Sequence, residues 1–368
     1  MRVVIAGGGS GGHLFPGVAV AQELLEREPG AEVVFIGSET GIEARVIPRE
    51  GYPIRYVRSA AVLGRSPVRK AVALFVVLAS MRACSQVYRE LRPDVVVGTG
   101  GYVSFAPVAA ARLQSIPTLV MEQNLVPGLA NRVLGKMADS VAVTYHESLA
   151  FFPKEKSRLT GNPVRSGVLR GKRGAALKLF SLEGERVTFL VLGGSAGASR
   201  INDAVLNALH HLLDVRDGVQ FLHQTGQQDY ERVRKIYRDM GFKAMVAPFI
   251  HQMGEAYAAS DAVICRAGAT TLAEITALGR PSVLVPYPHA AGHQEFNARK
   301  LLENGGCRML HERELTGKAL AGHIAELYRS EDLRADMRSH CRALGRPDAA
   351  QKVVDMALSL VKARSGNV

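Results

Sequence analysis

A chain of 368 residues, 47% of them hydrophobic, is long enough to form two domains that each bury an apolar core. The net charge of +12 predicts an anionic partner, but no helix-turn-helix, zinc knuckle or sheet of aromatic and basic residues supports a nucleic acid. Neither a signal peptide nor a run of about 18 apolar residues is apparent, so we expect no membrane-spanning segment.

Short apolar runs alternate with helical patterns through the first half of the chain. We predict strands at residues 3–6, 33–36, 54–57, 95–98, 118–122 and 141–143, and helices that include 18–27, 67–91 and 106–114. Successive β–α units of this kind form parallel, doubly wound sheets, whose ligands bind beyond the carboxyl ends of the strands.

The first strand runs into a glycine-rich loop, GGGSGGH at residues 7–13. Glycines between a strand and a helix let backbone N–H groups face an anion, usually a phosphate. Pro16 fits the first turn of a helix, so we expect the helix to begin there and His13 to lie in the loop. A histidine at this position can accept a proton, although it could instead only orient the backbone.

The same loop matches the dinucleotide-binding pattern G-x-G-x-x-G through Gly7, Gly9 and Gly12. Two features argue against a nicotinamide or flavin enzyme. The loop does not lead directly into the predicted helix, and the second strand ends in GSE at 37–39 rather than with an acid at its tip.

Basic residues are concentrated between residues 51 and 92, where eight of them occur with a single acid, Glu90. The predicted helix at 67–91 carries Leu74, Phe75 and Leu78. The basic residues that flank this apolar group are Arg65, Arg69, Lys70 and Arg82. An apolar patch surrounded by Lys and Arg is typical of a surface that binds anionic lipid reversibly. A core helix with a solvated basic edge is the alternative, and we expect it for the side with Val76 and Val77.

Two further turns of small and polar residues follow strands of the first half, GGYVS at 100–104 and MEQN at 121–124. Polar residues at strand ends usually line a site, although turn formation alone could explain the glycines. Tyr102 and Glu122 are therefore candidates for the acceptor side of a site.

The second half repeats the scheme, with strands at 187–192, 220–224, 245–249, 262–265 and 282–286 and helices that start near Ser199, Gln228, Met253, Thr270 and His293. A second glycine loop, GGSAGAS at 193–199, follows the first of these strands.

We place the domain boundary at GNPVR (161–165), before a basic stretch without strands at 170–178. A last helix at 348–363, capped by Asp348, is expected to return to the first domain. The predicted domains are 1–162 and 163–346, with a C-terminal helix at 347–368.

Residues 265–274, CRAGATTLAE, combine a strand end, a turn of small residues and a helix start that can hold a diphosphate. Glu274 could accept both hydroxyls of a ribose, or be an acid favoured by the helix dipole.

His289 and His293 have the i,i+4 spacing of metal ligands, but no third ligand is evident and no Asp-x-Asp motif occurs. The cysteines, which lack C-x-x-C spacing, predict buried thiols: Cys84, Cys265, Cys307 and Cys341. We expect neither a metal nor a cofactor.

Together these motifs resemble the MurG family of bacterial glycosyltransferases, in order from GGSGGH at 8–13 through GGYVS, EQN, GNPVR and GGS to RAGA at 266–269. The resemblance covers essentially the whole chain. It implies the GT-B fold, in which two doubly wound, Rossmann-like α/β domains face each other across a cleft. It also implies transfer of N-acetylglucosamine from UDP-N-acetylglucosamine to the 4-hydroxyl of undecaprenyl-diphosphate-linked N-acetylmuramoyl-pentapeptide. This step of peptidoglycan synthesis takes place at the cytoplasmic face of the inner membrane.

The resemblance also assigns residues. The donor-site residues that it implies are Ser10, Gly11, Gly12, Asn124, Arg165, Ser195, Ile250, Ala269, Thr270, Thr271, Glu274 and Gln294. Ile250 would bind uracil through its backbone, Glu274 the ribose and Gln294 the sugar. Our main hypothesis is an inverting, metal-independent displacement in which His13 is the general base or a residue that orients the base. Ser10 stands where other members have threonine, and His293 where some have a second glutamine, so a sugar contact by His293 is not carried over.

Two alternative functions would also involve the binding of a UDP-sugar. A UDP-N-acetylglucosamine epimerase of the same fold would need acids at the second carbon of the sugar and would have no use for a membrane-facing basic helix. A regulatory protein would bind the UDP-sugar without turnover. The expected partners are the donor, the lipid-linked acceptor, an anionic membrane surface and cell-wall synthesis proteins.

Overall fold

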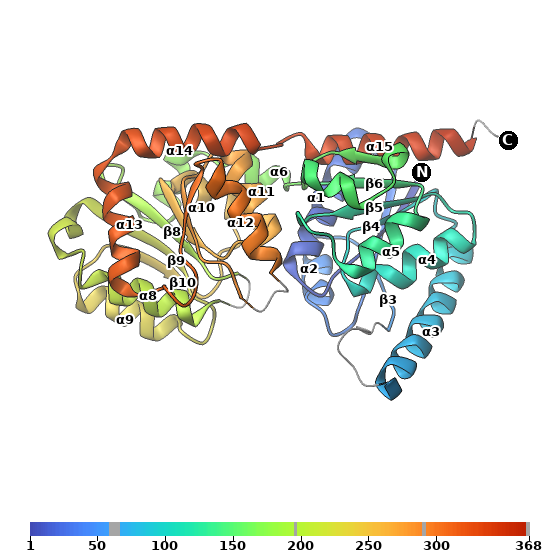
Figure 1. The fold of residues 1–368 in the computed structure, drawn as a ribbon, viewed down its shortest axis with the longest axis horizontal. Coiled ribbons are helices and arrows are strands. Elements are labelled where there is room, and N and C mark those ends of the chain that lie inside the picture. The colour runs from blue at the N-terminus through green and yellow to red at the C-terminus, as the bar shows by residue number, and fades with distance from the viewer. Residues whose placement is uncertain (59–66, 195–196, 289–291, 366–368) are drawn as a thin grey trace. The chain divides into compact units, whose positions relative to one another are not determined.

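The structure, a computed structural model, describes residues 1–58, 67–194, 197–288 and 292–365, and it divides into two compact units. Unit 1 comprises Met1–Ser166 and Pro347–Val368, and unit 2 comprises Gly167–Arg346. Each unit contains one parallel sheet with helices packed against it (Figure 1).

The sheet of unit 1 has seven parallel strands in the order β3-β2-β1-β4-β5-β6-β7. Their bounds are β1 (Arg2–Ala6), β2 (Glu32–Gly37), β3 (Ile54–Tyr56), β4 (Val95–Gly98), β5 (Thr118–Glu122), β6 (Ser140–Val143) and β7 (Ser157–Leu159). The first six confirm the strands predicted for this half. β7 was not predicted, because three residues with a central arginine at a sheet edge carry no apolar run.

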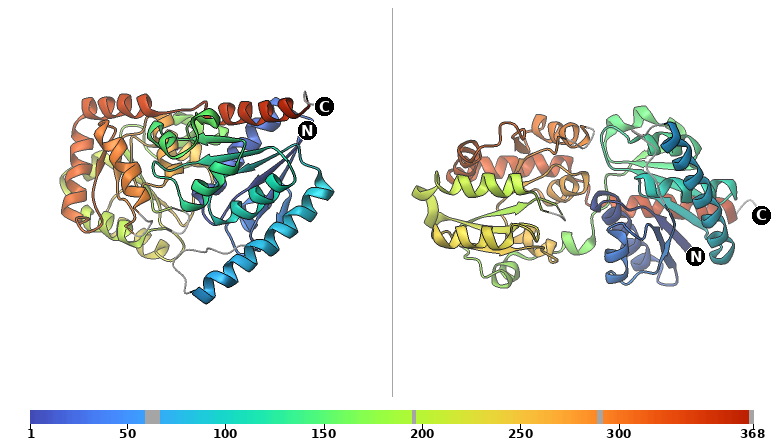
Figure 2. Two further views of the ribbon diagram at one scale, coloured as in Figure 1. Left: turned by 45° about the vertical axis from the view of Figure 1, so that its right-hand side comes forward. Right: turned by 90° about the horizontal axis from the view of Figure 1, so that it is seen from below.

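The helices of unit 1 are α1 (Gly11–Arg27), α2 (Glu43–Arg49), α3 (Pro67–Leu91), α4 (Phe105–Leu113), α5 (Leu129–Met137) and α15 (Ala349–Ser365), with short 3₁₀ turns at Tyr102–Ser104, His146–Phe151 and Lys154–Lys156. A short helix, α6 (Ser166–Leu169), stands where the chain passes into unit 2. α3 extends past the sheet at one end, and α15 lies along α1 (Figures 1 and 2).

The expected start of the first long helix at Pro16 is wrong. α1 begins at Gly11, where the N–H groups of His13 and Leu14 donate to the carbonyl of Ser10 (3.2 and 3.1 Å). Pro16 therefore lies inside the helix, at the cost of one N–H donor. The glycine loop thus leads directly into a helix, and the first argument against a dinucleotide site fails.

Alternate residues of the central strand β1 point into two different cores of unit 1. Val3 and Ile5 join a cluster with α1 and with Val353 and Val354 of α15. Val4 joins a second cluster that includes Tyr88 of α3 and residues of α4. The sheet is therefore covered on both faces, as its nearly continuous apolar strands require.

The sheet of unit 2 has six parallel strands in the order β10-β9-β8-β11-β12-β13. Their bounds are β8 (Val187–Leu192), β9 (Val219–Gln224), β10 (Ala244–Ala247), β11 (Ala262–Cys265), β12 (Ser282–Leu284) and β13 (Cys307–Met309). β10 ends two residues before the predicted end, next to Pro248, which has no N–H for a strand ladder. β13 was missed because it is short and contains Arg308.

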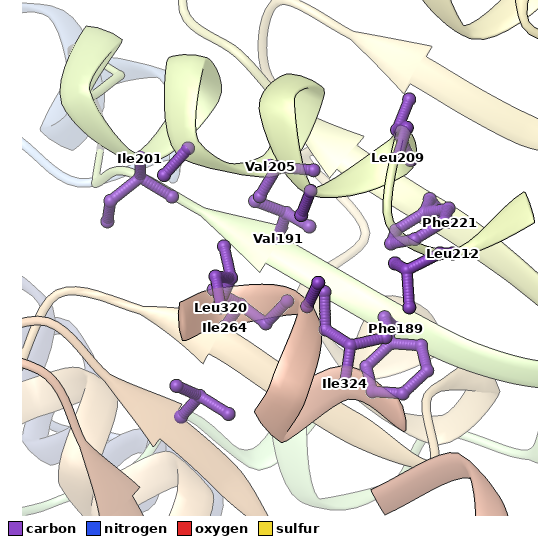
Figure 3. Close-up of a cluster of buried hydrophobic side chains, with 14 of the residues drawn as sticks. Phe189, Val191, Ile201, Val205, Leu209, Leu212, Phe221, Ile264, Leu320 and Ile324 are labelled. Carbon is purple, nitrogen blue, oxygen red and sulfur yellow. The ribbon is translucent and has the colours of Figure 1, made fainter. Parts of the chain in front are cut away.

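The helices of unit 2 are α7 (Arg173–Leu179), α8 (Ser199–Leu209), α9 (Tyr230–Asp239), α10 (Met253–Ala259), α11 (Ala269–Leu278), α12 (His293–Glu303), α13 (Gly317–Arg329) and α14 (Glu331–Leu344), with a 3₁₀ turn at Leu213–Gly218. Figure 3 shows the core, in which Phe189 and Val191 of β8 lie among side chains of α8 and α13. All four cysteines of the chain are buried free thiols, as the sequence predicts.

Candidate functional site

The first glycine loop joins β1 to α1 at the carboxyl edge of the unit 1 sheet. Ser10 precedes the helix in an extended conformation and is exposed, and Gly11 and Gly12 form the first helical positions. The predicted site residues Ser10, Gly11 and Gly12 therefore stand at a helix N-terminus, where the helix dipole and backbone N–H groups favour an anion.

His13 follows in the first turn of α1, and its hydrogen bonds determine its tautomer. Its Nδ1 lies 3.2 Å from the carbonyl oxygen of Thr99 and 3.1 Å from Oε1 of Gln123. Gln123 donates its Nε2 to the same Thr99 carbonyl (2.8 Å), which orients the amide so that Oε1 meets the imidazole. Both groups that meet Nδ1 are acceptors, so Nδ1 carries the proton and Nε2 of the neutral ring can accept one.

The glycines of GGYVS are explained by the imidazole beside them. Gly100 and Gly101 have φ values of +96° and +75°, which favour glycine. A Cβ atom at Gly100 would lie 2.8 Å from Nδ1 of His13, and one at Gly101 would lie 3.1 Å from Cδ2. The motif therefore makes room for the histidine. Tyr102, an acceptor-side candidate, is 46% exposed and its ring lies against Gly9.

Sequence reasoning missed Glu43, a fully buried carboxylate that holds the first glycine loop. Its Oε2 accepts the N–H of Gly9 (2.8 Å) and its Oε1 accepts the N–H of Ser38 (2.9 Å). A side chain at Gly8 or Gly41 would overlap this carboxylate. In sequence, a lone acid at the start of a short helix gives no signal for this role.

Glu122, the other acceptor-side candidate, is 2% exposed and accepts several hydrogen bonds. Its donors are the backbone and side-chain amides of Asn124 (2.8 and 3.2 Å), Nδ2 of Asn131 (2.9 Å) and the N–H of Gly128 (3.3 Å). Glu122 therefore shapes the loop that presents Asn124, a predicted donor-site residue. The guanidinium of Arg165, another such residue, lies 4.1 Å from the ring centre of Phe15 in α1.

In unit 2, the second glycine loop follows β8 and precedes α8. The carbonyl of Gly194 accepts the N–H of Gly197 (3.1 Å) and Nε2 of Gln224 (3.0 Å). Oε1 of Gln224 accepts the N–H of Ile250 (2.9 Å), whose side chain is buried. Ser195, predicted to lie in this loop, falls outside the described residues.

The CRAGATTLAE segment forms the end of β11 and the start of α11. Gly268 caps α11, Ala269 and Thr270 are buried, and Thr271 is half-buried. Glu274, one turn further, is 6% exposed and accepts the hydroxyl of Tyr257 (2.8 Å). The buried carboxylate and the helix N-terminus thus lie on the same element, α11.

Gln294 lies in the first turn of α12, where its Oε1 accepts the N–H of Tyr287 (2.9 Å). His293 precedes it and is half-buried, whereas His289 falls outside the described residues. Arg266 pairs with Glu312 (2.6 Å) and stacks on Tyr287. Within the described residues, no group of three or more His, Cys, Asp or Glu side chains is placed to hold a metal ion.

The outward side of α3 carries exposed apolar residues. Leu74, Phe75 and Leu78 are 58%, 72% and 55% exposed, whereas Val76 and Val77 are half-buried. Arg82 is exposed, and the side chains of Arg65, Arg69 and Lys70 fall outside the described residues. No helix in the described part of the chain is long and apolar enough to cross a membrane.

Comparisons with known proteins cover nearly the whole chain. Residues 3–143 match the glycosyltransferase family 28 N-terminal domain, and residues 188–353 match the glycosyltransferase family 28 C-terminal domain. A relative from Thermodesulfovibrio yellowstonii is 46% identical over 98% of this chain and 99% of its own length. One from Geotalea daltonii is 45% identical over 96% of each chain. Both are named UDP-N-acetylglucosamine–N-acetylmuramyl-(pentapeptide) pyrophosphoryl-undecaprenol N-acetylglucosamine transferase.

Solved structures agree with the relatives. The crystal structure of Acinetobacter baumannii MurG matches with a TM-score of 0.76 and 30% identity, covering 97% of this chain and 99% of that one. A putative UDP-N-acetylglucosamine 2-epimerase from Listeria monocytogenes matches with a TM-score of 0.68 over 96% and 94% of the two chains. Its identity of 14% shows a common fold alone.

Proposed function

The chain belongs to the MurG family of GT-B glycosyltransferases, and from that premise we propose that it moves N-acetylglucosamine from UDP-N-acetylglucosamine to the 4-hydroxyl of undecaprenyl-diphosphate-linked N-acetylmuramoyl-pentapeptide. The observation that carries the proposal is 46% identity over 98% of the chain to a relative named for this transfer. The similarity to epimerases, at 14% identity, extends only to the fold.

The proposed reaction is a direct displacement at the anomeric carbon of the donor sugar. His13 takes the proton of the acceptor hydroxyl through Nε2, which the bond from Nδ1 to Thr99 leaves as the basic nitrogen. The hydroxyl oxygen forms the new glycosidic bond while the bond to the UDP oxygen breaks, so the sugar configuration inverts. The N-terminus of α11, together with Ser195 of the second glycine loop, stabilises the charge on the departing diphosphate.

The decisive experiment supplies purified protein with labelled UDP-N-acetylglucosamine, in excess EDTA, with either the lipid-linked muramoyl-peptide or water. Transfer of label to the lipid acceptor is expected to persist in EDTA, because the protein's own dipoles stabilise the leaving group. Conversion of the donor to its 2-epimer would support the epimerase alternative, and binding without turnover would support a regulator. Loss of transfer in EDTA, restored by magnesium, would contradict the metal-free mechanism.

We further propose that α3 attaches the enzyme to the cytoplasmic face of the inner membrane. The support is the exposed group Leu74, Phe75 and Leu78, on the segment with eight basic residues and one acid. Such a surface combines apolar insertion with about 1 kcal/mol per basic residue near anionic lipid. Because the chain has no tryptophan, attachment should be reversible and sensitive to salt. Cell-wall synthesis proteins are expected partners at the same membrane.

Changing Arg65, Arg69, Lys70 and Arg82 together to glutamate should abolish co-sedimentation with phosphatidylglycerol vesicles at low salt. The affinity for UDP-N-acetylglucosamine should stay nearly unchanged, since none of these residues is assigned to the donor. A control variant in which basic residues of α9, such as Arg234 and Lys235, are changed to glutamate should still co-sediment with these vesicles. Failure of the wild-type protein to co-sediment with such vesicles at low salt would refute the membrane assignment.

A further inference from the structure

Gln224 connects two segments of unit 2 that lie far apart in sequence. It is the last residue of β9, 4% exposed. Its Nε2 donates to the carbonyl of Gly194 in the second glycine loop (3.0 Å), and its Oε1 accepts the N–H of Ile250 (2.9 Å). One planar amide therefore sets the distance between the loop after β8 and the segment after β10.

Two glycines of the second glycine loop, Gly194 and Gly197, lie near this contact. Gly194 and Gly197 have φ values of +88° and +81°, and the carbonyl of Gly194 accepts both the Gln224 amide and the N–H of Gly197. A side chain at Gly197 would overlap the carbonyl oxygen of Thr225. Gly194 and Gly197 thus lie directly against the end of β9, with the Gln224 amide as a hydrogen-bond donor to Gly194.

The segment after β10 is held against the end of β9 by backbone hydrogen bonds. Thr225 and Gly226 donate their N–H groups to the carbonyls of Ala247 and Pro248 (3.0 and 3.1 Å). The amide of Gln224 donates to the Gly194 carbonyl and accepts from the Ile250 N–H through two different atoms. A glutamate keeps the acceptor and loses the donor, and a methionine of similar size loses both.

We propose that Gln224 is a positioning residue of the donor site. It holds the second glycine loop and the Ile250 segment at the spacing that a nucleoside diphosphate requires, and it touches no reacting atom itself. The inference rests on the proposed function, in which these two segments receive the diphosphate and the base of the donor. They lie at the carboxyl edge of a parallel sheet, where ligands of such sheets bind.

The chain offers a matched control at the opposite end of the same strand. Gln220 of β9 is fully buried, and its Nε2 donates to the carbonyl of Glu183 (2.6 Å) and to Oγ1 of Thr188 (2.9 Å). Its Oε1 accepts the N–H of Glu183 (3.0 Å). Gln220 and Gln224 are therefore both buried and hydrogen-bonded glutamines of one strand, but Gln220 lies at its amino end.

The experiment compares Gln224→Met, Gln224→Glu and Gln220→Met with the wild-type full-length chain. Calorimetric titration with UDP and steady-state kinetics for both substrates are the readouts, with melting temperature as the measure of stability. Gln224→Met should raise the Kd for UDP and the KM for UDP-N-acetylglucosamine about tenfold or more, because the carbonyl of Gly194 and the N–H of the buried Ile250 both lose the bonds that set their spacing. The KM for the lipid acceptor should change less than twofold. Gln220→Met should lower the melting temperature while the Kd for UDP stays within twofold.

A wild-type measurement tests the proposal without depending on the folding of any variant. Hydrogen exchange with and without UDP should show protection of residues 193–194 and 197–199 together with residues 249–252. Protection of only one segment would overturn the proposal, as would unchanged UDP affinity in Gln224→Met or an equal loss in Gln220→Met. Wild-type protein that binds no UDP would instead contradict the proposed function, so the two failures can be told apart.

Discussion

At the scale of single residues, buried hydrogen bonds decide what each polar side chain can do. His13 has its proton held on Nδ1 by Thr99 and Gln123, whereas His223 has both ring nitrogens bonded inside the core of unit 2. Glu274 and Glu43 are both buried acids, but Glu43 accepts backbone N–H groups of unit 1 and Glu274 a tyrosine hydroxyl of unit 2. The hydrogen-bond partner of a side chain, more than its residue type, therefore distinguishes a structural role from a candidate functional one.

Removing the imidazole of His13 should slow the transfer and leave donor binding intact. We expect His13→Ala to lose about 10²–10⁴-fold in kcat, the usual contribution of a general base. The Kd for UDP should stay near the wild-type value, and added imidazole should restore part of the rate. Full activity of the variant would remove His13 from the chemistry.

Glu274→Ala should weaken donor binding by well over tenfold, because charge-assisted hydrogen bonds to ribose hydroxyls contribute about 1.5–3 kcal/mol each. Tyr257→Phe is the matched control, since it removes the hydroxyl that donates to the same carboxylate (2.8 Å) and leaves the carboxylate in place. Calorimetric titration with UDP measures the affinity of both variants. Equal affinities of Glu274→Ala and wild type would place the ribose elsewhere.

At the scale of elements, a buried polar network fastens two helices of unit 2 to β9. His223 of β9 donates from Nε2 to Oδ1 of Asn202 in α8 (3.0 Å) and accepts at Nδ1 from the hydroxyl of Tyr237 in α9 (3.1 Å). Asn202 in turn donates to Asp229, the residue before α9 (2.8 Å). Burial lowers the pKa of His223 to about 3, so the ring is neutral in the folded state.

This network predicts a specific dependence of stability on pH. In the unfolded chain His223 regains a pKa of about 6.5, so below that pH the unfolded state binds a proton that the folded state does not. The free energy of unfolding should therefore be highest above pH 6.5. It should fall by up to about 1.4 kcal/mol per pH unit as the pH drops towards 3.

Urea titrations between pH 7.5 and 5 measure this slope. His223→Gln lacks the titrating group, and its slope over the same range should be shallower than that of the wild type. A direct check is the NMR shift of the His223 ring protons, which should stay constant from pH 8 to 5. A ring that titrates near pH 6 would contradict the buried neutral assignment.

At the scale of the whole molecule, the two ends of the chain build one core. Val353 and Val354 of α15 are fully buried with α1 and β1 of unit 1, although unit 2 separates them in sequence. Arg27 and Asp355 form an ion pair on the same helix pair (2.7 Å). Unit 1 therefore reaches its full core only after the last helix of the chain has been made.

Val354→Asp should destabilise unit 1 by several kcal/mol, since it removes a valine worth about 1.5–3 kcal/mol of burial and leaves a charge in the core. Asp355→Ala on the same helix should cost only about 0–1 kcal/mol, because that ion pair is largely exposed. Thermal unfolding and limited proteolysis compare the two variants. Similar melting temperatures for Val354→Asp and wild type would mean that α15 does not complete the core.

The sequence by itself determined the α/β class, the position of every strand with a long apolar run, the two glycine loops and the resemblance to a glycosyltransferase family. Hydrophobic periodicity and turn residues are local properties, so they can be read along the chain. Short edge strands such as β7 and β13, and the true start of α1, have weak local signals and were missed.

Only the tertiary structure decided which residues act together. Thr99 and Gln123 lie 86 and 110 residues from His13 in sequence, yet both bond to its Nδ1 because the sheet order places β4 beside β1 and β5 beside β4. Glu43 and Gln224 acquire their roles in the same way, through bonds to loops that follow other strands. Such contacts depend on strand order, which residue patterns along the chain do not specify, and the roles of these residues therefore became visible only in the folded protein.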